Sequence, residues 1–222
     1  MLIYRDENHS YTLDGRPIPG ITRILSDLGA FPGSDHFTEE SRQRGQAAHL
    51  ACQLADQHCP QADSVDEALE RLDLAEALLP FLAGYLKFRR ENRYHALRWE
   101  TPACSRRLRV GGRPDSDGQL DGQHALVDVK SWASQGAKPK HSAEVQTAAY
   151  AIMLAEEAQI PDHRIQRYVL KLPGDGNYRL YHCTDAMDLE EATWCALLWH
   201  RWHDRGIFKS LGDPQLEFAI GE

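Results

Sequence analysis

The stretch GRPDSDGQLDGQHALVDVKSW, residues 112–132, decides the fold because it contains two candidate strands joined by a tight turn. Asp121-Gly122 is a strong signal for a two-residue hairpin turn, since both central residues of such a turn need positive φ. Strands that pair around this turn place Asp115 directly opposite Asp128. The sequence therefore predicts a β-hairpin that carries two facing carboxylates.

The facing aspartates share one side of this hairpin with a lysine. Alternation along the second strand puts Lys130 on the same side as Asp128, whereas Val127 and Val129 point to the other, apolar side. Two carboxylates about 5 Å apart repel each other by roughly 3 kcal/mol at an effective dielectric of about 20. A good cross-strand pair contributes at most about 1 kcal/mol, so the hairpin needs a compensating charge.

A divalent cation between the carboxylates would supply that charge. Mg²⁺ takes oxygen ligands and typically uses one or two carboxylates with water and substrate phosphate, and the peptide carbonyl of Val129 would add an oxygen. Beside such an ion, Lys130 would orient a water molecule and offset charge that develops at a phosphate. The alternative is that Asp128 and Lys130 form an ordinary surface ion pair, while Asp115 and Asp117 are turn residues.

The order of these residues resembles the PD-(D/E)XK nuclease superfamily. Pro114-Asp115 stands for PD, and Asp128-Val129-Lys130 stands for D-x-K. The resemblance implies an α/β fold with a restriction-endonuclease-like core, in which helices flank a mixed central sheet, together with an N-terminal helical part.

Further motifs are similar to the RecB-like branch and to phage-type and mitochondrial genome maintenance exonucleases. EVQTAAYAIML resembles a Q-x-x-x-Y helix and implies roles for Gln146 and Tyr150, which lie one turn apart on one helix face. RGQAAHLA resembles a G-x-x-x-H motif and implies His49 as a metal ligand. ITRIL (residues 21–25) and WETPACS (residues 99–105) are also similar, and the second implies Glu100 as an extra acidic residue near the metal.

The resemblance implies a metal-dependent DNA exonuclease that hydrolyses phosphodiester bonds from DNA ends in recombination, repair or phage DNA metabolism. The expected cofactor is Mg²⁺ or Mn²⁺, as two ions. The expected catalytic residues are Asp115, Asp128, Lys130, Gln146 and Tyr150. The expected metal ligands are His49, Glu100, Asp115, Asp128 and Val129.

Other interpretations of the same residues stay open. One is a restriction-type endonuclease on the same core, and another is a non-catalytic descendant that binds DNA or a partner. His49 could be a packed or solvated histidine, and Gln146 and Tyr150 could simply cap the sheet. An exposed Glu100 at the start of a strand needs no function.

Charge is unevenly distributed along the chain. The formal net charge is −8, yet residues 84–113 contain nine basic residues against two acidic ones. Such a patch can follow a phosphate backbone with little base readout, although a solvated helix face would look the same. The predicted DNA-binding residues are Arg44, Arg106, Arg107, Arg109, Arg113, Lys138 and Lys140.

A recombinase or helicase is a further expected partner, since no P-loop motif for strand separation is present.

We expect one nuclease domain over residues 1–222, with residues 18–155 as the best-matching core and residues 156–222 as a hairpin and helix that complete it. The start of the chain has no signal-peptide pattern and no long apolar run occurs, so we expect an intracellular protein without a membrane partner. Cys183 and Cys195 stand too far apart for the cysteine pattern of the iron–sulfur relatives, so we expect no such cluster.

The residue pattern also predicts the elements around the hairpin. Helices are expected from about residue 21 and over 38–58, 64–93, 142–159 and 188–205. Strands are expected over 10–13, 101–110, 112–120, 124–131, 166–172 and 178–183. Loops are expected over 31–36 and 133–141.

Overall fold

The computed structural model describes residues 1–30, 39–131 and 141–207, and the predicted loop 31–36 and all but the last residue of 133–141 lie outside this range. Its centre is a five-stranded sheet with the order β10-β9-β8-β7-β4. The strands of this sheet are β4 (Tyr94–Trp99), β7 (Ser116–Leu120), β8 (Gln123–Ser131), β9 (Gln166–Leu172) and β10 (Arg179–His182). Only β8 and β9 run parallel, so the sheet is mixed, which confirms the predicted fold class.

The predicted hairpin is confirmed with its register. Ser116 pairs with Val127 and Leu120 pairs with Gln123, which is the pairing that a turn at Asp121-Gly122 requires. Both turn residues have positive φ, 54° for Asp121 and 79° for Gly122. The register therefore brings Asp115, just before β7, opposite Asp128.

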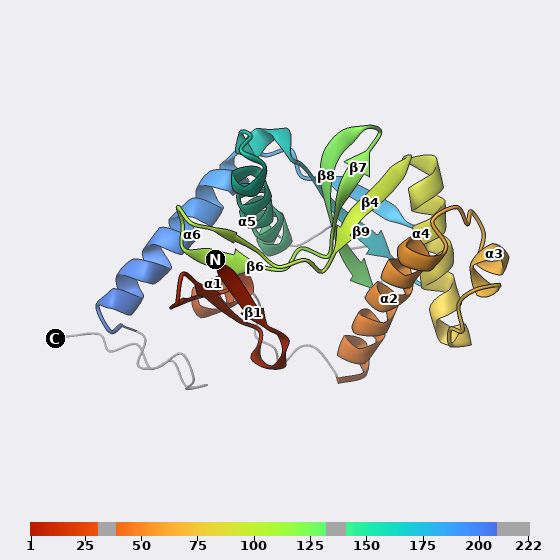
Figure 1. The fold of residues 1–222 in the computed structure, drawn as a ribbon, viewed down its shortest axis with the longest axis horizontal. Coiled ribbons are helices and arrows are strands. Elements are labelled where there is room, and N and C mark those ends of the chain that lie inside the picture. Colours follow the sequence, from red (N-terminus) through yellow and green to blue (C-terminus); the bar gives the residue numbers. More distant parts are fainter. Residues whose placement is uncertain (31–38, 132–140, 208–222) are drawn as a thin grey trace.

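Helices cover both faces of the sheet, with α5 and α6 on one side and α2 and α4 on the other (Figure 1). The helices are α1 (Ile21–Asp27), α2 (Glu39–His58), α3 (Val65–Leu69), α4 (Leu79–Glu91), α5 (His141–Ala158) and α6 (Met187–Asp204). Short 3-10 turns are η1 (Asp6–Asn8), η3 (Glu76–Leu78) and η4 (Asp162–Arg164). None of the helices in the described ranges is long and apolar enough to cross a membrane.

Strand β8 separates two hydrophobic clusters. Leu126 packs into the cluster formed with α1, α5 and α6. Val127 and Val129 belong to the cluster formed with α2 and α4. The alternation predicted for this strand is confirmed, and it leaves Asp128 and Lys130 on the side that faces α5.

A separate three-stranded sheet, β1-β2-β3, is built from the N-terminal residues. Its strands are β1 (Leu2–Arg5), β2 (Ser10–Leu13) and β3 (Arg16–Ile18). The strand expected over residues 10–13 is β2, the chain turns at Asp14-Gly15 into β3, and β3 with Pro17 is an edge strand. A parallel bridge between Gly20 and Gly111 joins this part to the core, where Gly111 N–H donates to the Pro19 carbonyl at 2.9 Å.

One predicted strand is wrong in detail, and one strand was missed. Residues 101–110 do not form one strand, because the chain reverses at Arg109 (φ 53°) and makes the short antiparallel pair β5 (Ala103–Ser105) and β6 (Val110–Gly112). Strand β4 was not expected at all. Its alternation is irregular, with a register shift between Ala96 and Arg98 against β7.

The predicted helix 64–93 is also divided. Ser64 caps the short α3, accepting a hydrogen bond from Glu67 N–H at 3.3 Å, as expected. The chain then leaves the helix and α4 begins at Leu79. Pro80 lies in the first turn of α4, where a missing N–H costs nothing, so it starts a helix where an interruption was expected.

Candidate active site

The predicted site residues gather around one cavity of about 710 Å³ beside the end of β8. Residues from the core that line it are Glu100, Gly112, Arg113, Asp115, Asp128, Lys130, Gln146 and Tyr150. They come from segments far apart in the sequence, namely the turn after β4, the hairpin β7–β8 and helix α5. The same cavity therefore holds both the aspartate–lysine group and the glutamine–tyrosine pair.

Three candidate metal ligands lie together, and two of them, Glu100 and Asp115, line this cavity. The Nδ1 atom of His49, on α2, lies 3.7 Å from Oδ1 of Asp115 and 3.9 Å from Oε1 of Glu100. The ligand atoms of these three residues are all within 4.8 Å of one another. Glu100 has a positive φ of 48°, and its N–H donates to the Asp115 carbonyl at 3.0 Å. This backbone contact fixes Glu100 beside Asp115.

Asp115 and Asp128 are held in place from different directions. Oδ2 of Asp115 accepts a hydrogen bond from Val129 N–H at 2.7 Å, across the hairpin. Asp128 is buried, and its Oδ1 accepts a hydrogen bond from Nζ of Lys130 at 2.9 Å. Oδ2 of Asp128 lies 2.8 Å from the same Nζ but, within the described residues, accepts no hydrogen bond of good geometry. This buried oxygen is therefore ion-paired with Lys130 but receives no well-aligned hydrogen bond from the described residues.

Burial and the charges of neighbouring residues shift the pKa values of these groups. Burial raises the pKa of Asp128 to about 6, with Lys130 opposing this and Asp115 adding to it. Burial disfavours the Lys130 ammonium, but Asp128 and Asp115 outweigh it and raise the lysine pKa. Burial lowers the pKa of His49, but Asp115 and Glu100 raise it by more, so the His49 pKa lies above its usual value. Lys130 therefore stays protonated at neutral pH.

These residues fit a divalent cation. Carboxylate oxygens are the ligands that Mg²⁺ and Mn²⁺ prefer, and an imidazole nitrogen is compatible with the second. Oδ2 of buried Asp128 and the cluster of His49, Glu100 and Asp115 offer such ligands beside one cavity. The expected ligand role of the Val129 carbonyl stays a prediction, because the observed contact of Val129 uses its N–H.

Gln146 and Tyr150 are neighbours on α5, as predicted. Nε2 of Gln146 donates to the Tyr150 hydroxyl at 3.1 Å and to Oγ1 of Thr22 at 2.9 Å. Burial, together with Asp128 and Asp115, holds the pKa of Tyr150 well above its usual range, so its hydroxyl keeps its proton. Position 112 has no space for a side chain, because a Cβ there would lie 2.6 Å from Cε1 of Tyr150.

Most of the predicted DNA-binding arginines contact carboxylates. Arg106 pairs with Asp14 at 2.5 Å and Arg107 pairs with Asp162 at 3.0 Å. Arg113 pairs through Nε with Oε2 of Glu100 at 2.7 Å and through Nη1 with Asp6 at 2.9 Å, and it lines the cavity. Arg44 lies on α2 before His49, and Arg109 lies in the turn before β6. Lys138 and Lys140 lie outside the described residues, and DNA binding by all of these side chains stays a prediction.

Asp117 takes no part in this cavity, although it shares a face of β7 with Asp115. Its carboxylate accepts hydrogen bonds from Arg98 at 2.6 and 2.8 Å and contacts His124 at 2.5 Å. Burial opposes ionisation, yet the hydrogen bonds from His124 and Arg98 lower the pKa of Asp117 overall. Asp117 is therefore a paired structural carboxylate.

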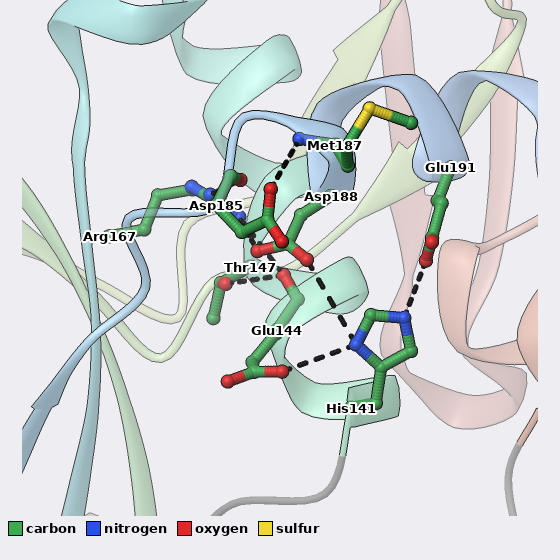
Figure 2. Close-up of polar contacts among 8 residues, drawn as sticks. All are labelled: His141, Glu144, Thr147, Arg167, Asp185, Met187, Asp188 and Glu191. Atoms are coloured by element: carbon green, nitrogen blue, oxygen red, sulfur yellow. Dashed lines mark hydrogen bonds and ion pairs between the residues drawn. The ribbon is translucent and has the colours of Figure 1, made fainter.

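A second group of acidic residues and a histidine joins the starts of α5 and α6 (Figure 2). Nδ1 of His141 lies 3.2 Å from Glu144, and Nε2 lies 2.5 Å from Glu191. Asp188 is bound by Nη1 of Arg167 at 2.9 Å. Because the two imidazole nitrogens face different carboxylates, the contacts form an ion-pair network between the helices.

Three features of the site were not found from the sequence. The hydrogen bond from Gln146 to Thr22 gives a role to the ITRIL motif, in which Ile24 and Leu25 are buried in the core. The pairing of Arg113 with Glu100 was missed because Arg113 was assigned to DNA. The proximity of the N-terminal sheet to the cavity has no signal in the sequence, since it depends on long-range packing.

Comparisons with known proteins were made for the whole chain. The family model described as PD-(D/E)XK nuclease superfamily matches residues 25–217. No curated protein matches the chain. Among solved structures, "Crystal structure of SSO0001" is similar with 10% sequence identity over 82% of this chain and 83% of that chain, at a TM-score of 0.37. That likeness is too weak to support an inference about fold or function.

Proposed function

The chain belongs to the PD-(D/E)XK nuclease superfamily, and from this premise we propose that it is a metal-dependent deoxyribonuclease that removes nucleotides from DNA ends. The proposed reaction is hydrolysis of a phosphodiester bond by water. The membership supports a nuclease, and we further propose a metal cofactor, a DNA substrate and a preference for DNA ends.

One observation carries the proposal, namely that Asp115, Asp128 and Lys130 converge on a single cavity. The carboxylates face each other across the hairpin, and the peptide N–H of Val129 fixes one of them. Asp128 keeps a buried oxygen that, within the described residues, is ion-paired with Lys130 but accepts no well-aligned hydrogen bond. A buried polar atom of this kind is costly unless a ligand uses it.

Each residue has a task in the proposed reaction. His49, Glu100, Asp115 and Asp128 would hold Mg²⁺ or Mn²⁺, as one ion or two. When bound, such an ion polarises phosphoryl oxygens and lowers the pKa of water. Lys130 stays protonated because of Asp128 and donates to an oxygen of the scissile phosphate, where negative charge increases. Gln146, held by Thr22, and Tyr150 orient the phosphate from the α5 side.

Action on DNA ends is supported by the motif order, from the glycine–histidine motif of His49 to the helix of Gln146 and Tyr150. This order is similar to that of RecB-like, phage-type and mitochondrial genome maintenance exonucleases. A part in recombination, repair or phage DNA metabolism, alongside a recombinase or helicase, is proposed on the same resemblance. The basic residues would contact the DNA backbone, so cleavage should weaken steeply with salt.

The proposal is tested with end-labelled linear DNA, single- and double-stranded, incubated beside a closed circular DNA of similar length. Mg²⁺, Mn²⁺ and a chelator are compared. We expect metal-dependent release of nucleotides from linear DNA and an intact circle. Cutting of the circle would replace the exonuclease with an endonuclease on the same core, and failure to cut any substrate with either metal would contradict the proposed activity.

A further inference from the structure

The cavity extends beyond the catalytic carboxylates onto the N-terminal part of the chain. Residues 8–11, 18–23 and 26 line this side of it, and we call them the N-terminal wall. They come from the start of β2, the end of β3 and helix α1. The cavity therefore has more room than a single phosphate group needs, and the additional room is enclosed by the N-terminal wall.

The N-terminal wall is fixed to the core. The ring of Tyr11 packs so closely on Gly111 that a Cβ there would lie 2.5 Å from Cγ of Tyr11. On the other side, the ring of Tyr4 lies 5.0 Å from that of Tyr11 and beneath the guanidinium of Arg113, which is 5.3 Å from its centroid. Since Arg113 also pairs with Glu100, this packing holds the wall in register with the proposed metal ligands.

Charge differs between the two sides of the cavity. Glu100, Asp115 and Asp128 lie on the core side, whereas the described residues of the N-terminal wall that line the cavity include no carboxylate. A DNA chain that places one phosphate at the carboxylates must continue past them. The N-terminal wall offers such a path, and the carboxylate of Asp6, which lies 3.9 Å from Nδ1 of His9, is paired with Arg113.

His9 presents a flat ring on this path. Its side chain is 69% exposed, and its backbone has a φ of 47°, a left-handed conformation at the end of η1. The Tyr4 hydroxyl contacts Nδ1 of His9 at 2.8 Å, which restrains the ring without covering it. Asn8 and Ser10, on either side, add amide and hydroxyl groups to the cavity lining. A planar ring with polar neighbours suits a nucleobase, because bases stack on aromatic side chains whatever their sequence.

Arg23 presents a cation on the same wall. Its Nε donates to the buried carboxylate of Asp27 at 2.8 Å, and Asp27 also accepts a hydrogen bond from Nε1 of Trp199 at 2.9 Å. The Arg23 side chain is still 42% exposed. Asp27 thus binds the guanidinium at Nε only. The planar guanidinium has further N–H groups, whose geometry suits the oxygens of a phosphate.

We propose that the N-terminal wall is a nucleotide-binding subsite, in which the His9 ring stacks on a base and Arg23 binds a backbone phosphate next to the bond that is cut. This inference rests on the proposed deoxyribonuclease function. It adds a specific ligand, the nucleotide that neighbours the scissile phosphate, and it gives the N-terminal sheet a part in substrate binding.

The test measures binding and cleavage of short labelled oligonucleotides that carry an abasic nucleotide at successive terminal positions. Binding is followed by fluorescence anisotropy with Ca²⁺, and cleavage is followed with Mg²⁺. The variants are His9→Ala, His9→Trp, Arg23→Gln and Arg23→Lys in the full chain. His163→Ala and Arg164→Gln, exposed on η4, serve as matched controls, and thermal unfolding shows that each variant is folded.

For His9→Ala we expect about tenfold weaker binding and a correspondingly higher KM on intact DNA, the change that follows from loss of one stacked base. His9→Trp should restore the affinity. On DNA with the abasic nucleotide at the matching position, wild type and His9→Ala should bind equally. Arg23→Gln should reduce the slope of log affinity against log salt by about one, and Arg23→Lys should not.

The subsite would be overturned if His9→Ala bound intact DNA as tightly as wild type does. It would also be overturned if His9→Ala lost the same affinity on intact and on abasic DNA. An unchanged salt slope in Arg23→Gln would overturn the phosphate contact. Failure of the wild type to cleave DNA, with binding that still depends on His9, would overturn the proposed function and leave the subsite standing.

Discussion

Nδ1 of His49 lies 3.7 Å from Oδ1 of Asp115, and this contact brings helix α2 to the β7–β8 hairpin. Glu100 lies on the other side of the same imidazole nitrogen, at 3.9 Å. Two carboxylates around one histidine hold its pKa above the usual value in spite of burial. A divalent cation would take the place of that proton, so proton and metal should compete for this group.

Asp117→Asn should destabilise the protein whether or not metal is present. Its carboxylate is buried and hydrogen-bonded by Arg98, so breaking the pair should lower the free energy of unfolding by about 3 kcal/mol. Urea unfolding with and without Mn²⁺ measures this. An Asp117→Asn protein that unfolds like wild type but no longer responds to Mn²⁺ would contradict the structural role.

Asp128→Asn should behave in the opposite way, although both aspartates lie in the same hairpin. Because burial raises the Asp128 pKa to about 6, the ionised carboxylate is a cost to the metal-free protein at pH 8. The variant also loses the ion pair of Asp128 with Lys130, which opposes this gain, so we expect the metal-free variant to lose less than the roughly 3 kcal/mol of a broken buried pair. Mn²⁺ should raise the melting temperature of wild type and not of the variant.

The affinity for Mn²⁺ should fall as the pH falls through about 6. Asp128 has its pKa raised to about 6 by burial, so below that pH a proton occupies a carboxylate that the metal needs. Isothermal titration calorimetry between pH 5 and 8 measures the dependence, with proton release expected at the lower end. An affinity that is constant over this range would mean that Asp128 is not a ligand.

His141 should stabilise the protein at low pH. Hydrogen bonds to Glu144 and Glu191 raise its pKa, and Asp188, held by Arg167, faces the same nitrogen as Glu144. Stability from a raised histidine pKa is present below the unfolded value of about 6.5 and is lost as the pH rises through the folded value.

The imidazole is largely exposed, so the His141→Gln variant should lose only about 0.5 kcal/mol at pH 5.5 and less at pH 8.5. Urea unfolding at the two pH values measures the difference, and His163→Gln controls for loss of an exposed imidazole. A larger loss at pH 8.5 than at pH 5.5 would contradict the ion-pair network.

The β7–β8 hairpin could be predicted from the sequence because its determinants are local. Asp121-Gly122 sets the turn, the turn sets the register, and the register places Asp115 opposite Asp128. The alternation of Val127 and Val129 with charged residues then assigns the two faces. No contact with distant residues is needed for any of these steps.

The positions of His49 and Glu100 could not be derived in that way. Helix α2 is far from the hairpin in the sequence, and only the resemblance of a short motif indicated that His49 would reach Asp115. Glu100 follows β4, a strand that was missed because its pairing with β7 is irregular. Its left-handed backbone and its hydrogen bond to Asp115 are consequences of tertiary packing.

The position of the N-terminal wall beside the cavity could not be predicted from the sequence. The hairpin of residues 10–18 was expected, but its contact with the cavity depends on Tyr11 fitting against Gly111 and Gly20. Glycines at those positions have no distinguishing sequence pattern. The place of a small sheet relative to a core is decided by such close contacts, which only the folded chain reveals.

The most direct measurement is cleavage of end-labelled linear DNA by wild type and Lys130→Ala under identical Mg²⁺ concentrations. Lys130 contacts Asp128 at 2.8 Å and stays protonated, so its loss should reduce the cleavage rate by roughly 100- to 1,000-fold, the effect of removing one stabilising donor. Arg164→Gln, which replaces a cation outside the cavity lining, should cleave at the wild-type rate. Equal rates for wild type and Lys130→Ala would contradict the assignment of the active site to this hairpin.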